Sequence, residues 1–152
     1  MAEGKYGKYV IKVPLAPAAH HPHLPLHPVL RKESMPWEDR DSIEFGFVTH
    51  WIQEPLLMLK EPHVHENFPQ WLFFLGSNPK DPNEFDAEVE MYLGRDEDQE
   101  KFVITEPTII RVPPGVYHGP LNWKVINKPV QFIDISLAPE YTRIEQSETK
   151  KA

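Results

Sequence analysis

Short strand-like segments follow one another from Ile43 to Leu137, and they restrict the fold more than any other feature of this chain. Each is rich in β-branched and aromatic residues and is bounded by Pro, Gly, Asn or Asp. The segments span residues 43–52, 56–59, 71–75, 89–93, 102–105, 108–112, 123–126 and 130–137. They lack the 3.6-residue repeat of an amphipathic helix. We therefore predict an all-β sandwich or barrel that occupies residues 43–138.

The two ends of the chain differ from this central region. Five of the 17 prolines fall within residues 14–28, where they exclude a helix and a central strand. Residues 1–42 are therefore predicted to form an N-terminal arm and linker, with a short edge strand at 8–13 and then an extended, polyproline-like segment. The arm carries four of the eight histidines: His20, His21, His23 and His27. Residues 139–152 are predicted to be a solvated C-terminal tail.

The composition excludes several classes of site and partner. The chain has 152 residues and a formal net charge of −7, so we expect neither a general nucleic-acid binder nor a protein held to anionic lipid. It has no cysteine, which removes disulfides, thiolate zinc sites and iron–sulfur clusters. No apolar run is long enough for a signal-peptide core or a membrane span, so the expected location is the cytoplasm.

Two histidines separated by one residue, His63 and His65, give the first indication of a metal site. On a strand, side chains two residues apart point to the same face, so both imidazoles can approach one point. His118 follows the tight turn at 113–115 and could supply a third ring from another strand. The pattern alone also fits three buried structural imidazoles that hydrogen-bond to the backbone.

The residues around these histidines form two motifs. The first runs from His63-Val-His65 through Gln70 to Gly76, and the second is Pro113-Pro-Gly-Val-Tyr-His-Gly-Pro-Leu-Asn122. Together they resemble the motifs of the cupin superfamily, which read H-x-H followed by Glu and Gly, and P-x-G-x-x-H-x-x-x-N. The second motif matches at every fixed position. The resemblance covers residues 63–122 by motif and 43–138 by the surrounding strands, and it does not cover the arm or the tail.

The resemblance implies a single-domain cupin, a double-stranded β-helix or jelly-roll barrel with one metal ion in its mouth. His63, His65 and His118 would be ligands, and Pro113 and Gly115 would form the turn that aims His118. Imidazole nitrogens with oxygen donors suit divalent manganese, iron, nickel, zinc or copper, and intrinsic affinity alone does not choose among these. The expected cofactor is therefore one divalent transition metal per chain, of open identity.

Two departures from the cupin pattern leave the fourth ligand open. The Glu position holds Gln70, a neutral donor, and the gap to Gly76 is one residue short. Either Gln70 coordinates through its amide oxygen, or a carboxylate from a neighbouring strand does. Glu88 and Glu90 share one face of a strand, and either would serve as ligand or general base if that face lines the barrel; if it meets water, both are solvated. Tyr117, beside a proposed ligand, is a candidate pocket wall and hydrogen-bond donor.

Other residues have both a functional and a structural interpretation. His50 either lines the cavity or is a hydrogen-bonded core histidine. The arm histidines either form a second metal site or, as we favour, lie in a solvated or partner-packed arm. We expect four aromatic residues to fill the barrel core rather than to form a stacking platform: Trp71, Phe73, Phe74 and Trp123.

A three-histidine metal site limits the chemistry. Such an ion can polarise a carbonyl, generate hydroxide or hold an anionic substrate. We favour a hydrolase, lyase or isomerase that activates a small enolisable substrate, such as a 1,3-dicarbonyl, a hydroxy acid or a polyol-like ring compound. The alternatives are an iron- or nickel-dependent dioxygenase that cleaves a C–C bond or ring, and a non-catalytic cupin that binds a small ligand. Few basic residues fall near the motifs apart from Arg111 and Lys124, so a sugar diphosphate is not expected.

The arm also predicts the oligomeric state. An apolar, proline-rich segment has little reason to remain in solution, and symmetric dimers are the commonest soluble oligomers. We predict a homodimer in which residues 1–30 cross onto the partner.

Overall fold

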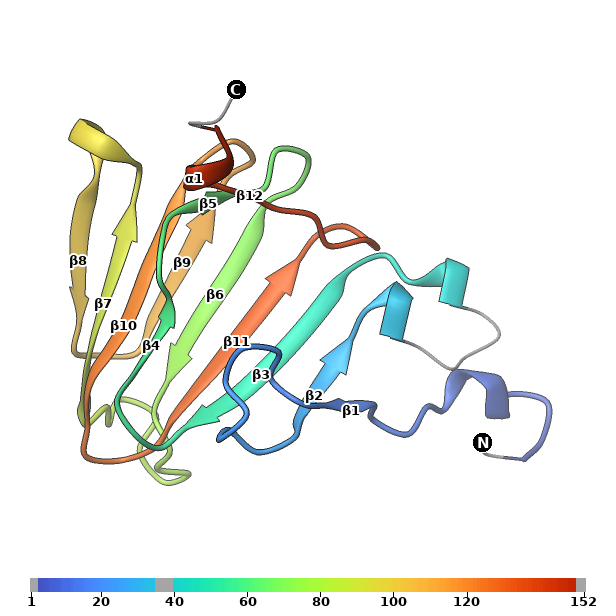
Figure 1. The fold of residues 1–152 in the computed structure, drawn as a ribbon. Helices are drawn as coiled ribbons and strands as arrows, with labels where there is room; N and C mark the ends of the chain where they lie inside the picture. Colours follow the sequence, from blue (N-terminus) through green and yellow to red (C-terminus); the bar gives the residue numbers. More distant parts are fainter. Residues whose placement is uncertain (1–2, 35–39, 150–152) are drawn as a thin grey trace.

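The computed structural model describes residues 3–34 and 40–149 of the chain (Figure 1). The strands are β1 (Leu15–Ala16), β2 (His27–Leu30), β3 (Gly46–Ile52), β4 (Leu56–Leu59), β5 (His63–Val64), β6 (Gln70–Leu75), β7 (Ala87–Leu93), β8 (Glu100–Ile104), β9 (Thr108–Val112), β10 (His118–Ile126), β11 (Val130–Ser136) and β12 (Ile144–Glu145). The helical turns are η1 (Gly7–Tyr9), η2 (Lys32–Ser34), η3 (Arg40–Ser42), η4 (Asp96–Asp98) and α1 (Gln146–Thr149). Over the described residues, no helix has the length and apolar character needed to cross a membrane.

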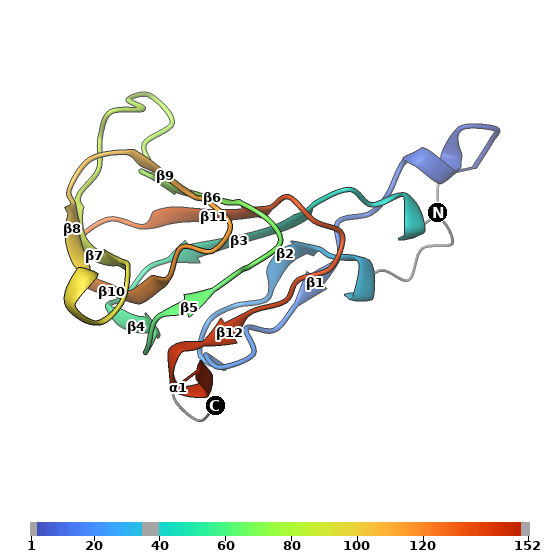
Figure 2. The same cartoon turned by 90° about the horizontal axis from the view of Figure 1, so that it is seen from above.

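The strands of the described chain form two antiparallel sheets that face each other. The order in the first sheet is β1-β2-β3-β11-β6-β9, and in the second it is β12-β5-β10-β7-β8, with β4 also paired to β10. Seen from above, the two sheets are the walls of a barrel, with β6, β11 and β3 on one side and β10, β4 and β5 on the other (Figure 2). The predicted all-β, cupin-type jelly roll is confirmed.

The predicted strands are found with small shifts at their ends. β4 and β9 have the predicted bounds, and most of the others differ by three residues or fewer at either end. β10 is the exception, because it begins at His118, well before the predicted start at Trp123. Gly119 and Pro120 look like a strand break in the sequence, yet the strand continues through them to the proposed ligand.

Side chains alternate between the space inside the barrel and its outer surface. Phe74, Trp123 and Phe132 point inward and pack with ring centroids 5.6, 5.2 and 5.4 Å apart. Trp71 and Phe73 lie on the opposite face of β6 and are only half-buried. The core assignment is therefore confirmed for Phe74 and Trp123 and is wrong for Trp71 and Phe73, because the two-residue period of a strand sends alternate side chains outward.

The N-terminal segment contributes two strands to the first sheet. β2 pairs with β3 at Val29 and Leu30, directly after Pro28, and β1 pairs with β2 on the other side. Pro28 has no N–H to donate, but the ladder to β3 begins only after it, so proline is tolerated here. The predicted strand at 8–13 is wrong, since η1 occupies its beginning and residues 10–13 are exposed and outside any strand.

The C-terminal segment packs against the second sheet. β12 pairs with β5, and the Gln146 N–H donates to the Pro62 carbonyl oxygen at 2.8 Å. The segment thereby covers the edge of β5, which would otherwise present unpaired backbone groups. The prediction of a solvated tail is therefore wrong for residues 141–149, while residues 150–152 lie outside the described residues.

Candidate metal centre

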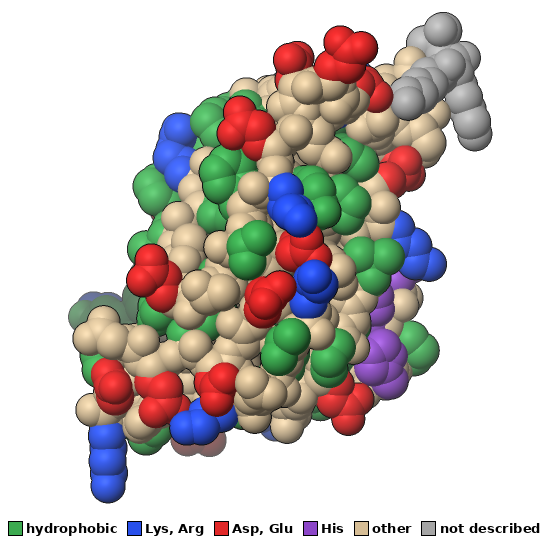
Figure 3. All heavy atoms as spheres, turned by 90° about the vertical axis from the view of Figure 1, so that its left-hand side faces the viewer, with side chains coloured by type: hydrophobic (Ala, Val, Ile, Leu, Met, Phe, Trp, Pro, Cys, Tyr) green, Lys and Arg blue, Asp and Glu red, His purple; other side chains and the backbone are tan. Residues whose placement is uncertain are grey.

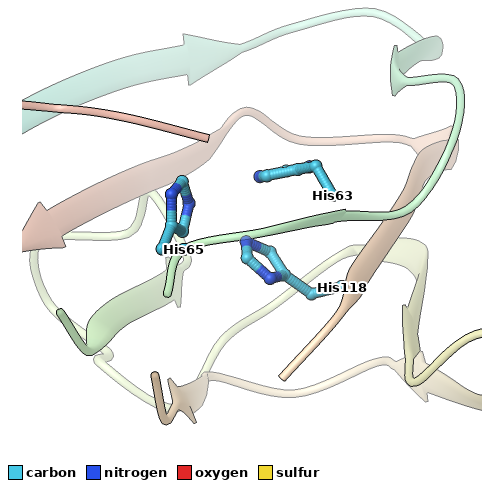
Figure 4. Close-up of side chains that lie close together, drawn as sticks. All are labelled: His63, His65 and His118. Atoms are coloured by element: carbon cyan, nitrogen blue, oxygen red, sulfur yellow. The ribbon is translucent and has the colours of Figure 1, made fainter. Parts of the chain in front are cut away.

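The three predicted histidines lie together inside the barrel. His63 belongs to β5, His65 follows that strand, and His118 opens β10 opposite His63. All three are buried, and one ring nitrogen from each lies within 4.8 Å of the other two. Figure 4 shows the rings directed toward a common space. The predicted convergence of imidazoles from two separate strands is confirmed.

Hydrogen bonds fix the tautomers of His65 and His118, and among the described residues each of the three rings keeps one buried nitrogen without a partner. His65 Nδ1 donates to the Thr142 carbonyl oxygen at 2.6 Å, and His118 Nδ1 donates to the Val116 carbonyl oxygen at 3.2 Å. Because a carbonyl only accepts, the lone pairs lie on the two Nε2 atoms. Among the described residues, His65 Nε2, His118 Nε2 and His63 Nδ1 are buried without a hydrogen-bond partner. Such orphaned acceptors are unfavourable unless something binds them, so the cluster fits a cation.

The second motif forms the turn that positions His118. Gly115 has φ +82°, a conformation that glycine adopts without strain, and its N–H donates to the His65 carbonyl oxygen at 2.9 Å. Gly119 has φ +100°, and a Cβ there would lie 2.9 Å from the Glu61 carbonyl oxygen. The two glycines therefore allow the second motif to approach the first closely enough for the rings to meet.

The surroundings keep the three imidazoles neutral. Burial lowers the pKa of His63 to about 2 and that of His118 to about 4. Burial also lowers the pKa of His65, against the opposing hydrogen bond to Thr142. The nearby Arg143 guanidinium is a smaller cause of the lowered pKa of each ring. The neutral ring is the form that binds a metal ion.

Gln70, at the start of β6, is buried and lines the same cavity as His63 and His118. Its Nε2 donates to Asp134 Oδ1 at 2.7 Å. Since a carboxylate only accepts, this bond sets the orientation of the amide and leaves Oε1 as the free group. In the described chain, this buried oxygen has no hydrogen-bond partner. Gln70 is thus held with its amide oxygen free to bind a metal ion.

Asp134 is a functional candidate that the sequence analysis missed. It lies on β11 and lines the cavity, and burial raises the pKa of its carboxyl to about 6. The two-residue alternation gave no signal for it, because both faces of β11 carry apolar residues and only the fold shows that Asp134 shares the inner face with Val130 and Phe132. A carboxylate on a face with buried apolar neighbours requires a polar partner, which Gln70 supplies.

A cavity of about 570 Å³ opens beside the cluster, and both terminal segments contribute to its wall. Arg31, just after β2, lies over the Tyr141 ring at 4.2 Å, and Tyr141 packs against His65 at 4.9 Å. Arg143 pairs with Glu145 at 2.8 Å. Sequence analysis missed Arg31 and Arg143 as site residues because they lie far along the chain from both motifs, and only tertiary packing brings them there.

The two candidate carboxylates on β7 are not brought to the histidines. Val89 and Met91 point into the core, so Glu88 and Glu90 face outward. Lys124 Nζ lies 3.2 Å from Glu90 and 3.6 Å from Glu88, and Lys101 Nζ lies 3.1 Å from Glu90. Figure 3 shows acidic and basic side chains side by side on this outer face. These ion pairs account for both glutamates, which the structure excludes as ligand or base of the cluster.

Tyr117 also lies away from the cavity. Because His118 points inward, its neighbour in the chain points outward. The Arg95 guanidinium lies 4.4 Å above the Tyr117 ring, and Arg95 Nη1 donates to its hydroxyl at 3.2 Å. The predicted role of Tyr117 as a wall of the pocket is therefore wrong.

Three of the four arm histidines line the cavity together with His50. These three are His20, His21 and His27, whereas His23 is exposed. His21 Nε2 lies 3.1 Å from the Met58 carbonyl oxygen, which ties the arm to β4 of its own chain. Among the described residues, only the three-histidine cluster has His, Asp or Glu side chains close enough together to hold a metal ion. The described arm residues form no second metal site.

Comparison with solved structures supports the fold. A single-residue variant of the Bacillus subtilis oxalate decarboxylase is similar over 96% of this chain and 35% of that one, with a TM-score of 0.54 and 12% identity. A formate complex of the Lactobacillus farciminis oxalate decarboxylase matches 82% of this chain and 32% of that one, with a TM-score of 0.52 and 12% identity. No family model matches this chain. No curated protein sequence matches it.

These likenesses agree with the resemblance to cupins at the level of the fold. This chain spans only 28% of the first of the matched decarboxylase chains, at 12% identity. The chemistry of this protein therefore has to be argued from its own residues.

Proposed function

We propose that this protein is a mononuclear metalloenzyme in which His63, His65 and His118 bind one divalent transition-metal ion. The observation that carries the proposal is the set of three buried ring nitrogens without hydrogen-bond partners among the described residues. When bound, the ion would polarise a carbonyl oxygen of the substrate and stabilise the enolate that forms beside it. The neutral imidazoles need not lose protons before binding it at neutral pH.

Gln70 is the proposed fourth ligand, through Oε1. The hydrogen bond from Nε2 to Asp134 orients the amide so that Oε1 is the atom left free to coordinate. A donor set of three imidazoles and one amide is uncharged, so it leaves the full charge of a divalent ion to act on the substrate. Asp134 is then a positioning residue, because it acts on the substrate only through Gln70.

The charges around the cavity favour an anionic substrate. Arg143 lies close enough to the three imidazoles to lower the pKa of each, and Arg31 also lines the cavity. The three basic residues that line the cavity are matched by three acidic ones: Arg31, Lys60 and Arg143 against Glu61, Asp134 and Glu145. The excess positive charge is therefore that of the divalent ion held by an uncharged donor set, which suits a small molecule that carries a carboxylate or becomes an enolate. A cavity of about 570 Å³ is of the size that holds a small organic ligand.

We infer a lyase, hydrolase or isomerase reaction on a small enolisable compound such as a 1,3-dicarbonyl or a hydroxy acid. Arg31 and Arg143 would hold its negative oxygens, and the apolar wall that includes Leu72, Leu121 and Phe132 would exclude water. We also propose a homodimer, formed through the part of the N-terminal arm before Leu15, because β1 and β2 pair within their own chain and the predicted crossing of residues 1–30 is therefore wrong for Leu15–Leu30.

The test begins with metal content. Purified protein is expected to contain close to one transition-metal ion per chain, and His118→Ala to contain almost none while it keeps the β-sheet circular dichroism spectrum. His23→Ala, which removes an exposed arm histidine, is the matched control and should retain the ion. Wild-type protein that stays metal-free after dialysis against iron, manganese, nickel and zinc would overturn the proposal.

The reaction class needs a second measurement. Metal-loaded protein is supplied with simple 1,3-diketones and hydroxy acids, and turnover is followed together with oxygen consumption. Turnover without oxygen uptake is the expected result. Turnover that consumes oxygen would replace the proposed class with a dioxygenase, and tight binding without turnover would indicate a ligand-binding protein.

A further inference from the structure

The cavity extends beyond the metal cluster to a second pair of histidines. His27 on β2 and His50 on β3 both line it, and their ring centroids lie 4.0 Å apart with the planes tilted by 33°. His27 is only 6% exposed, and its Nδ1 is buried without a hydrogen-bond partner in the described chain. Neither residue belongs to the three-histidine cluster or to the cupin motifs, so the proposed metal site leaves this pair without a role.

Both rings of the pair are neutral at physiological pH. Burial, together with smaller effects of the neighbouring His27, His21 and Arg31, lowers the pKa of His50 to about 4. Burial and the charge of Arg31 also lower the pKa of His27. A neutral imidazole offers one donor and one acceptor, and neighbouring Val48 and Phe132 make this part of the wall apolar. The partner that suits such a place is an uncharged hydroxyl, because it can both donate and accept.

The register of the first sheet gives the distance between the two ends of the cavity. His50 lies opposite Phe132 on β11, and Gln70 lies opposite Ser136 on the same strand. The two positions are four residues apart along β11, about 13 Å at about 3.3 Å per residue, and β3 and β6 flank β11 on opposite sides at about 4.8 Å each. The backbones of His50 and Gln70 therefore lie about 16 Å apart, and both residues line the cavity between them. A molecule that reaches from one end to the other needs a polar group at each of its ends.

We propose that His27 and His50 form a second binding subsite, for a neutral hydroxyl group, at the end of the cavity away from the metal cluster. The substrate then has an anionic oxygen group at the cluster and a hydroxyl at its other end. The subsite itself depends only on His27 and His50, whereas its use in orienting a substrate rests on the proposed metalloenzyme.

Phenol tests the subsite directly by NMR in protein with labelled histidine side chains, both with and without added zinc. Phenol should shift the ring signals of His27 and His50 and leave those of His63, His65 and His118 in place. His27→Phe keeps a ring in contact with His50 but removes the hydrogen bond, and it should weaken phenol binding about fivefold while binding of toluene is unchanged. His50→Phe gives a second variant should the first not fold, and His23→Phe is the control. Phenol that shifts neither ring of the pair, or that binds both variants as tightly as wild type, would overturn the subsite.

Straight-chain carboxylates of increasing length, each compared with its terminal hydroxy derivative, then connect the two ends. At the chain length that reaches the pair, the added hydroxyl should strengthen binding to the zinc-loaded protein about fivefold, and His27→Phe should abolish this gain. A gain retained in His27→Phe, or no gain at any length, would contradict the subsite. Phenol binding at the pair with no binding of any carboxylate would instead contradict the anion site at the three-histidine cluster, so the failures of the two proposals are distinguishable.

Discussion

A single hydrogen bond decides which atom of Gln70 faces the cavity. The amide could in principle present either its oxygen or its nitrogen, and only the oxygen can bind a metal ion. Asp134 accepts from Nε2 at 2.7 Å, and Ser136 Oγ lies 3.5 Å from the same nitrogen. The three residues share the inner face of the first sheet at its end near His63 and His118. At the scale of the residue, the candidate site is set by hydrogen-bond partners as much as by the ligands themselves.

Gln70→Glu should make the protein depend on metal for its stability. The substitution places a second carboxylate beside buried Asp134, and without metal this should lower the free energy of unfolding by about 2 kcal/mol or more. Zinc should restore the stability, because the new carboxylate is then paired with a cation. Thermal unfolding with and without zinc measures both effects. Gln131→Glu, on the outer face of the same sheet, is the control. Equal responses to zinc in the two variants would show that Gln70 does not contact the ion.

His50 should make the folded state sensitive to acid. Its pKa is about 4 in the folded protein, against 6.5 in the unfolded chain. Between these values the unfolded chain binds a proton that folded His50 does not, so the free energy of unfolding falls as the pH is lowered. The groups that face His50 are His27, His21 and Arg31, and all of them lower its pKa.

His50→Phe should therefore lose less stability than wild type between pH 6.5 and pH 4. Urea unfolding at a series of pH values measures the slope for each protein. His23→Phe should behave like wild type, since that residue is exposed. Parallel curves for wild type and His50→Phe would mean that His50 is not held neutral by the fold.

The C-terminal strand β12 and helix α1 act as one element that holds the three-histidine cluster in place. β12 pairs with β5, which carries His63. Thr142, just before β12, supplies the carbonyl oxygen that fixes the tautomer of His65. Ser147 is tied to Glu61 by a bond of 2.8 Å from its hydroxyl, and Gln146 to Pro62 by one of 2.8 Å from its N–H. Groups that orient a metal-binding imidazole contribute to metal affinity almost as strongly as the ligands.

Removal of residues 141–152 should weaken zinc binding by about 10- to 100-fold while most of the β-sheet signal remains. The truncated chain loses the hydrogen-bond acceptor of His65 and the strand that pairs with His63. Competition with a chelator gives the zinc affinity, and circular dichroism reports on the sheets. Removal of residues 150–152 alone is the control. An affinity equal to that of the full chain would show that the segment does not organise the cluster.

At the scale of the whole molecule, the N-terminal segment has two parts. From Leu15 to Leu30 it supplies β1 and β2 and lines the cavity, so this part belongs to the barrel of its own chain. Before Leu15 the chain extends away from the barrel (Figures 1 and 2), and it exposes Tyr6, Tyr9, Val10 and Val13, each with more than half of its surface accessible. Apolar side chains gathered on an extended segment indicate a surface that is covered in an assembly.

Deletion of residues 1–13 should convert the predicted homodimer to a monomer and leave the barrel intact. The deletion stops before β1, so His27, Val29 and the cavity wall are retained. Light scattering coupled to size-exclusion chromatography gives the mass of both proteins, and zinc affinity confirms that the site survives. If the full chain and the shortened chain have the same mass, the segment before Leu15 is not the dimer contact.

The sequence by itself determined most of the strands between Gly46 and Ser136, the convergence of His63 and His65, and the turn that delivers His118, because each of these follows from local geometry. The two-residue alternation of a strand also separates its two faces. It shows which face is buried only when the apolar residues all lie on one face. On β7 they do, and Glu90 is outside; on β11 both faces carry apolar residues, and only the fold shows that Asp134 is inside. Tertiary structure alone decided the rest: Arg31, Thr142 and Arg143 reach the cluster from segments remote in the chain. Such contacts depend on how the two ends pack against the barrel, and no local pattern of residues records that packing.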